Sequence, residues 1–186
     1  MTTPAVSPRP LRSRRSCLAV PGSSTKMLDK AQGLPADQVF LDLEDAVAPD
    51  AKEAARKNVV DALGNGDWGG RTRVVRVNDL TTHWTYRDVV TVVEGAGAQL
   101  DCVMLPKVQS AAQVAWLDLM LTQIEKTMGY EVGRIGIEAQ IENAAGLIAA
   151  IWLRQLPPAG TVPGLLVLLA GLALVIRSGA RAVPVE

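Results

Sequence analysis

The stretch RIGIEAQIENAAGL, residues 134–147, decides the fold. Within it, aliphatic residues alternate with glycine and polar residues: Ile135, Ile137, Ala139 and Ile141 against Gly136, Glu138, Gln140 and Glu142. Successive side chains of a β-strand point to opposite faces, so this pattern predicts a buried strand with one aliphatic and one acidic face. An ordinary amphipathic strand with its polar face in water has the same pattern. The functional alternative is a bound divalent cation, since such ions prefer oxygen ligands.

Composition limits the classes of protein to consider. The chain has 186 residues, of which 48% are hydrophobic and 20% charged, as expected for one globular domain. Nineteen Lys and Arg balance nineteen Asp and Glu, so no overall charge favours nucleic acid or an anionic membrane as a partner. Cys17 and Cys102 each begin an apolar run and lack metal-site spacing, which predicts small buried side chains in a reducing, cytoplasmic setting.

Strands and helices are expected to alternate along the chain. The predicted strands are residues 17–20, 38–47, 73–78, 101–107 and the stretch from 134. The predicted helices are residues 25–32, 50–63, 82–94 and 110–128. Strand starts are 21 to 35 residues apart, the size of successive βαβ units. Parallel strands with such connections form either a barrel or an open doubly wound sheet.

Polar residues near the ends of these strands favour the barrel. Alternation places Phe40, Asp42 and Glu44 on one face of their strand, and Val74, Arg76 and Asn78 on one face of the next. Barrel enzymes build their sites from several strand ends, whereas an open sheet concentrates ligand residues at one switch point. No G-x-G-x-x-G follows the first strand and no Walker A motif occurs. We therefore expect an α/β chain carrying five βα units of a TIM-type (β/α)₈ barrel.

An ordered set of motifs resembles one known family. The motifs are VPGSS (20–24), FLDLEDAVAPDAKEAAR (40–56), DWG (67–69), VVRVND (74–79), WTYRDVV (84–90), DCVMLPKV (101–108) and IEAQIENAAGL (137–147). Together they resemble the HpcH/HpaI aldolase and citrate lyase beta-subunit family, with the strongest similarity to its malyl-coenzyme A lyase branch. The resemblance implies a TIM-type barrel, Mg²⁺, an acyl-coenzyme A substrate and reversible carbon–carbon cleavage to acetyl-coenzyme A and a 2-oxo acid. It also implies homo-oligomers, trimers or hexamers in intact relatives.

The resemblance assigns roles to individual residues. Glu142 matches the first Mg²⁺-binding carboxylate, and Arg76 matches the arginine that grips the acyl or keto-acid end of the substrate. Glu44 and Asp45 match acids beside the metal that orient bound water or the arginine. Mg²⁺ accepts one or two protein carboxylates and leaves positions for substrate oxygens, and it can stabilise an enolate. A guanidinium supplies a planar, bidentate clamp.

The resemblance also locates a coenzyme A segment. Lys30 and the loop Pro21, Gly22 and Ser23 match the part of the family that handles coenzyme A. Ser24 departs from the malyl-coenzyme A lyase branch, which tends to have arginine there, so nucleotide contact at this position stays open.

Three polar side chains receive plainer interpretations. His83 has no partner visible in the sequence and is expected in a solvated loop or at a helix start. Lys107 could attract a phosphate or carboxylate, but a charge at a strand end is usually only solvated. Glu138 is expected to point inward as supporting polar structure.

The chain divides into three predicted regions: a flexible arm (1–13), a partial barrel domain (14–147) and a divergent apolar tail (148–186). The uninterrupted apolar run 165–176 spans about 18 Å as a helix. A bilayer core is about 30 Å thick, so a membrane span is not expected. The family's second metal ligand, an aspartate of a sixth strand, has no match, which predicts impaired cleavage. Three alternatives stay open: an active lyase, an inactive chain that only binds ligand or assembles with partners, and a protein associated with membranes through its tail.

Overall fold

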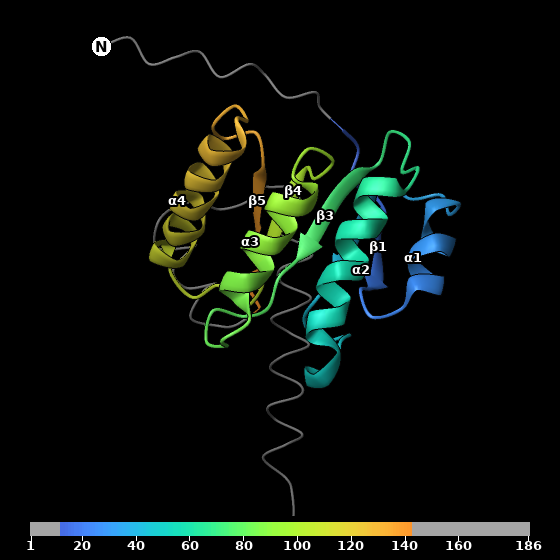
Figure 1. Ribbon diagram of the computed structural model, residues 1–186, viewed down its shortest axis with the longest axis horizontal. Helices are drawn as coiled ribbons and strands as arrows, with labels where there is room; N and C mark the ends of the chain where they lie inside the picture. Colours follow the sequence, from blue (N-terminus) through green and yellow to red (C-terminus); the bar gives the residue numbers. More distant parts are fainter. Residues whose placement is uncertain (1–11, 143–186) are drawn as a thin grey trace, which may run out of the picture. The chain divides into compact units, whose positions relative to one another are not determined.

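Five parallel strands form one sheet in chain order. The computed structural model describes residues 12–142. The strands are β1 (Cys17–Pro21), β2 (Gln38–Asp42), β3 (Thr72–Arg76), β4 (Cys102–Leu105) and β5 (Gly136–Ala139). The order is β1-β2-β3-β4-β5 and every neighbouring pair is parallel (Figure 1). Each strand therefore pairs with its sequence neighbour, as in a barrel, and no switch point interrupts the described sheet. The barrel-type fold predicted from the sequence is confirmed.

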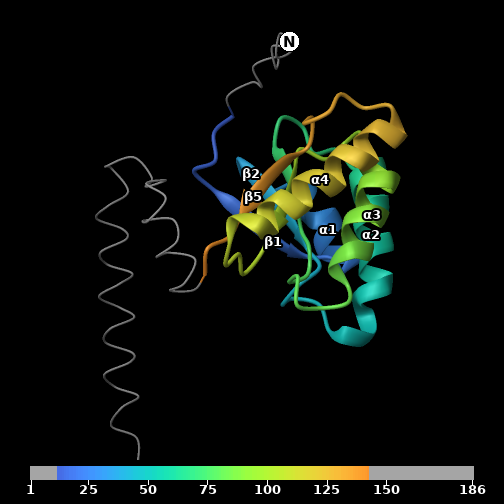
Figure 2. The same cartoon turned by 90° about the vertical axis from the view of Figure 1, so that its left-hand side faces the viewer.

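Helices cover one face of this sheet. They are α1 (Thr25–Gln32), the short 3₁₀ helix η1 (Pro49–Ala51), α2 (Lys52–Asn65), α3 (Thr85–Ala96) and α4 (Ala111–Met128). Figures 1 and 2 show α1 to α4 on the same side of the strands. Local sequence sets the ends: the Ser24 hydroxyl accepts a hydrogen bond from the Met27 N–H at 3.3 Å and begins α1. Gly129, with φ of 72°, ends α4 in the left-handed conformation that glycine tolerates.

The two faces of the sheet carry different side chains. Val39, Leu41 and Val75 belong to the large core between strands and helices. The opposite face carries a smaller apolar cluster of Phe40, Val74, Cys102 and Met104. Alternation within β2 and β3 therefore assigns the faces as the sequence predicted. The smaller cluster lies on the face that turns inward in a barrel.

Strand ends differ from the sequence prediction. β2 stops at Asp42, so Glu44 and Asp45 lie in the following loop and not on the strand. β5 stops at Ala139, and Ile141 is 47% exposed where alternation predicted a buried side chain. β4 stops at Leu105, and beyond it the Val108 N–H donates to the Gln140 carbonyl at 2.9 Å, which keeps the two segments side by side after both strands have ended.

Arginines of the N-terminal segment form ion pairs with residues in or next to three strands. Arg12 forms an ion pair with Asp101 just before β4, with 2.9 Å between Nη1 and Oδ1. Arg14 pairs with Glu138 of β5, and Arg15 pairs with Asp37 just before β2. Residues 12–15 thus lie against strand ends that are far apart in the sequence.

Two further predictions concern burial and membranes. Cys102 is buried as expected, but Cys17, the first residue of β1, is exposed. Among residues 12–142, no helix is long and apolar enough to cross a membrane. The prediction for the tail, 148–186, and most of that for the arm, 1–13, lies outside the described residues.

Candidate active site

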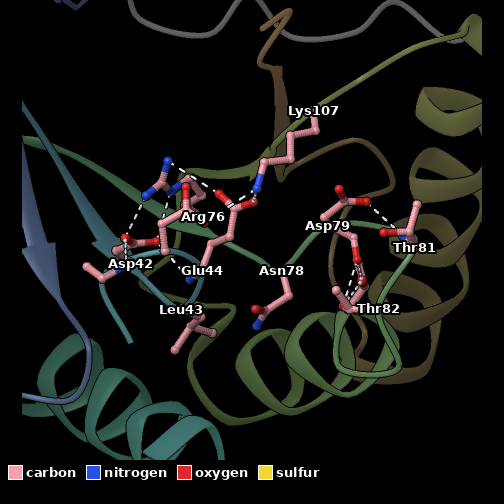
Figure 3. A network of polar contacts seen from close by, with 12 residues as sticks. Asp42, Leu43, Glu44, Arg76, Asn78, Asp79, Thr81, Thr82 and Lys107 are labelled. Carbon is pink, nitrogen blue, oxygen red and sulfur yellow. Dashed lines mark hydrogen bonds and ion pairs between the residues drawn. The ribbon is translucent and has the colours of Figure 1, made fainter. Parts of the chain in front are cut away.

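Arg76 and Asp42 form the centre of a charged cluster at the carboxyl end of the sheet. They are the last residues of β3 and β2 and lie opposite each other in register. The guanidinium donates through Nε to Oδ1 at 2.8 Å and through Nη2 to Oδ2 at 2.6 Å (Figure 3). Such a bidentate pair fixes the plane of the guanidinium. Neither side chain can rotate without breaking two charge-assisted bonds.

Backbone groups also hold Asp42. The N–H groups of Glu44 and Ala46 donate to its two oxygens at 2.8 and 3.1 Å. Burial acts to raise the pKa of Asp42, but the bonds from Arg76 and from these N–H groups outweigh it and hold the pKa below its ordinary value. Asp42 is therefore ionised at neutral pH and orients Arg76.

Glu44 lies between two cations. Its side chain is 5% exposed. Arg76 Nη1 is 3.3 Å from Oε2, and Lys107 Nζ is 2.8 Å from Oε1 (Figure 3). These are ion pairs, since neither oxygen has a hydrogen bond of good geometry within the described part of the chain. Burial raises the pKa of Glu44, and Lys107 and Arg76 oppose that rise.

Lys107 reaches the cluster from the end of β4. Its Nζ also lies 3.4 Å from Oδ1 of the exposed Asp45. The close Glu44 carboxylate raises the pKa of Lys107. The backbone of Lys107 has φ of 53°, which is uncommon for a residue other than glycine and is typical of functional sites. The expectation that Lys107 is only solvated is wrong, because Glu44 is within reach of its ammonium group.

The remaining site residues named by the resemblance are placed as follows. Glu142 is exposed and lies three residues after β5. Lys30 is exposed in the last turn of α1. In residues 12–142, no group of three or more His, Cys, Asp and Glu side chains is placed to hold a metal ion. The structure thus brings Arg76 and Glu44 into direct contact and connects Asp45 to them through Lys107, while the roles of Glu142 and Lys30 stay predictions.

The loop after β1 is shaped by packing. A Cβ on the buried Gly22 would lie 2.8 Å from Val59 Cγ2 and 2.9 Å from the carbonyl oxygen of Asp42. Only glycine fits this close approach, which lets the Gly22 N–H donate to that carbonyl at 2.8 Å. Pro21 is half-buried and Ser23 is exposed. A contact of this loop with coenzyme A stays a prediction.

Sequence reasoning missed two features of the cluster. Asp42 was placed on the polar face, but its pairing with Arg76 depends on the register of β2 against β3, which alternation alone does not give. Asn78 was expected to share a face with Arg76. β3 ends at Arg76, so alternation no longer applies, and the Asn78 side chain instead contacts Lys52 of α2 and Asp88 of α3. His83 is exposed, as expected.

Comparisons with known proteins identify relatives over most of the chain. L-malyl-CoA/beta-methylmalyl-CoA lyase from Cereibacter sphaeroides is 44% identical over 140 residues, which are 75% of this chain and 44% of that protein. Citrate lyase subunit beta from Escherichia coli is 36% identical over 151 residues, 81% of this chain and 49% of that protein. The chain thus spans less than half the length of these curated relatives.

Solved structures agree in fold. Haloferax volcanii malate synthase in a magnesium and glyoxylate complex superposes with a TM-score of 0.69 at 20% identity, covering 76% of this chain and 46% of that one. The CitE protein of Mycobacterium tuberculosis, in complex with magnesium, acetoacetate and coenzyme A, gives a TM-score of 0.53 at 31% identity, covering 74% and 44%.

A family profile covers the same region as these relatives. The profile of HpcH/HpaI aldolase/citrate lyase matches residues 15–152, which include all five strands and the charged cluster at their carboxyl ends. The chain therefore belongs to the HpcH/HpaI aldolase/citrate lyase family, whose members are carbon–carbon lyases.

Proposed function

We propose that the cluster around Arg76 is the acyl-binding side of a Mg²⁺-dependent coenzyme A ester lyase. The reaction is the reversible cleavage of a 3-hydroxyacyl-coenzyme A, of the malyl or citryl type, to acetyl-coenzyme A and a 2-oxo acid. The observation that carries the proposal is the Arg76 guanidinium held edge-on by Asp42 at the carboxyl end of a barrel-type sheet. In barrel enzymes this end of the sheet bears the active site.

The geometry of Arg76 suits binding of a carboxylate or a 2-oxo group. A guanidinium has five N–H donors. Asp42 takes Nε and one hydrogen of Nη2, and Glu44 lies beside Nη1. The remaining donors of the outer edge can bind substrate oxygens in the planar geometry that arginine favours. Lys107 adds a second positive charge on the other side of Glu44.

Glu142 is the carboxylate that we propose as the protein ligand of Mg²⁺. Mg²⁺ commonly uses one or two protein carboxylates and takes its other ligands from water and substrate. Glu44 is a poor direct ligand, because both its oxygens already face cations. Glu142 would hold the ion, which when bound supplies positive charge for an enolate oxygen. Lys30 and the loop Pro21–Ser23 would contact coenzyme A.

The experiment measures binding and turnover separately. The 186-residue chain with MgCl₂ is titrated with glyoxylate and with malyl-coenzyme A, and glyoxylate released from malyl-coenzyme A is trapped as its phenylhydrazone. Arg76→Lys keeps the charge but loses the bidentate fork, and we expect it to weaken binding by about tenfold or more. Lys57→Met, at an exposed position of α2, serves as the matched control.

Each outcome has a distinct meaning. Binding that depends on Arg76 together with turnover supports the lyase. Binding that depends on Arg76 without turnover supports the alternative, a subunit that only binds ligand or assembles with partners. Equal binding by the wild type and Arg76→Lys, or no binding by either, would overturn the proposal. Cytoplasmic localisation and a trimeric or hexameric assembly are proposed with the lyase, and light scattering of the purified chain tests the assembly.

A further inference from the structure

A buried ammonium group lies beneath the loop that carries Glu44. Lys52, at the start of α2, is 6% exposed. Its Nζ donates to the carbonyl oxygens of Leu43 and Glu44 at 2.7 and 2.6 Å, and to Asn78 Oδ1 at 2.6 Å. An ammonium group has three N–H donors, so all are used. Lys52 therefore ties the loop after β2 to the segment after β3.

Asp88 of α3 holds the other end of this network. It is fully buried and accepts hydrogen bonds through Oδ2 from the Asn78 N–H at 2.9 Å and from Asn78 Nδ2 at 2.6 Å. Its other oxygen accepts from Arg56 Nε at 2.6 Å. These bonds fix the Asn78 amide with its oxygen toward Lys52. The Asp88 carboxylate thus balances two buried positive charges: it binds Arg56 directly and connects to Lys52 through the Asn78 amide.

The Glu44 peptide is held on both sides by charged groups. Its N–H donates to Asp42, and its carbonyl accepts from Lys52. Beyond Leu43, whose N–H donates to the Arg76 carbonyl at 2.9 Å, the loop has no ladder bond to β3. Lys52 has no direct contact with the Arg76 guanidinium, and Figure 3 shows the Asn78 amide pointing away from it. Lys52 therefore contacts the cluster only through the backbone of the loop, and its charge acts on the Asp42 and Glu44 carboxylates from a longer distance.

We propose that Lys52 is a positioning residue, which sets the Glu44 carboxylate between Arg76 and Lys107 by fixing the carbonyls on either side of the Glu44 α-carbon. The inference rests on the proposed function, because it assigns the Glu44 position a role in binding the acyl or 2-oxo end of the substrate. Without Lys52 the loop relaxes, Glu44 moves toward water, and Arg76 loses its second partner.

A double-mutant cycle tests whether Lys52 acts through Glu44. Glyoxylate is titrated in the presence of MgCl₂ into the 186-residue chain and into Lys52→Met, Glu44→Gln and the double variant. We expect Lys52→Met alone to weaken binding about tenfold, a typical effect of losing a supporting hydrogen-bond partner. In the Glu44→Gln background, Lys52→Met should change the dissociation constant by less than about twofold. Effects that multiply would overturn the proposal.

A spectroscopic measurement separates positioning from simple loss of charge. The ¹³C shift of the Glu44 carboxyl is followed against pH in the wild type and in Lys52→Met. Removing a nearby positive charge alone would raise the pKa of Glu44, whereas moving the side chain into water would lower it toward its ordinary value. We expect the pKa to fall in Lys52→Met and to stay unchanged in the control Lys57→Met. A rise or no change in Lys52→Met contradicts positioning.

Two further measurements keep the outcome decisive. If Lys52→Met does not fold, as judged by circular dichroism, Asn78→Ser replaces it, since this variant removes one partner of the ammonium and leaves both carbonyl bonds. Its expected effect has the same sign and is smaller. Arg76→Gln reports on the proposed function itself. Unchanged glyoxylate binding in Arg76→Gln refutes the lyase site, while the pKa measurement still decides whether Lys52 positions Glu44.

Discussion

Asp42 and Glu44 are two carboxylates two positions apart whose environments act on them in opposite directions. Asp42 receives two bonds from Arg76 and two from backbone N–H groups, which keep it ionised. Glu44 is equally hidden from water but has only ion pairs, so burial dominates and its pKa rises. Asp42 orients the Arg76 guanidinium, and Glu44 is the carboxylate beside that guanidinium whose protonation state can change.

For Asp42→Asn we expect a loss of about 3 kcal/mol in the free energy of unfolding at pH 7, since it breaks a buried ion pair. The pKa of Asp42 is lower in the folded protein than its ordinary 3.8, so the unfolded chain takes up the proton first as pH falls. The wild-type advantage is full above pH 3.8 and disappears as pH falls through the folded pKa. Urea unfolding of the wild type and of Asp42→Asn at several pH values measures this difference in the free energy of unfolding. Asp61→Asn, at an exposed position, is the control, and a pH-independent difference for Asp42→Asn contradicts the prediction.

Glu44→Gln should show the opposite slope. The pKa of Glu44 is higher in the folded protein than its ordinary 4.5, so as pH rises the unfolded chain releases its proton first. Wild-type stability therefore falls, relative to Glu44→Gln, from about pH 4.5 up to the folded pKa. The same urea series measures this difference. A wild-type stability that rises with pH relative to this variant would show that the two cations outweigh burial at Glu44.

The sequence predicted which residues are polar at the strand ends but not how they pair. Arg76, Glu44 and Asp45 were named by resemblance, and they do share one cluster. Asp42 and Lys107 were not assigned these roles, because their partners lie 34 and 63 residues away and meet them only when β2, β3 and β4 are in register. Such long-range contacts leave no periodic trace in a single sequence.

At the scale of elements, strand identity was easier to predict than strand length. Alternation between Val39, Phe40 and Leu41 gave the correct faces, because side-chain period is a property of the strand itself. The ends depend on neighbours. β2 was predicted to reach residue 47 but ends at Asp42, where the carboxylate of that residue captures the N–H groups of Glu44 and Ala46. The Asp42 side chain thus helps to end β2, because it binds backbone N–H groups that follow the strand.

The N-terminal segment provides a prediction at this scale. Replacing Arg12, Arg14 and Arg15 together by Gln removes ion pairs to the ends of β4, β5 and β2. The arginines are exposed, so we expect only a small combined loss of stability at low salt. Thermal unfolding should show a smaller loss in 1 M NaCl, because the Debye length there is only about 3 Å and exposed charges are strongly screened. Arg87→Gln, an exposed arginine of α3, is the control. A loss that salt does not reduce would contradict an electrostatic origin.

At the scale of the whole molecule, metal binding should be measurable as stability. If Glu142 holds Mg²⁺, MgCl₂ at 100 times the dissociation constant raises the free energy of unfolding by about 2.7 kcal/mol. Thermal unfolding with MgCl₂ or with EDTA measures the difference. Glu142→Gln should abolish it and Glu131→Gln, also exposed, should preserve it. Equal stabilisation of both variants would place the ion elsewhere.

The strand order has a consequence for how the chain folds. In the described sheet, each strand from β2 to β5 pairs with the strand before it, one βα unit away in the sequence. The entropic cost of bringing two strands together grows only slowly with the length of chain between them, and here that chain is a single connection with one α-helix. β1 and β2 can pair as soon as both have left the ribosome, and each later strand finds its docking edge already formed. The sheet can therefore grow by accretion during synthesis, with the Arg76 clamp complete once β3 has docked on β2.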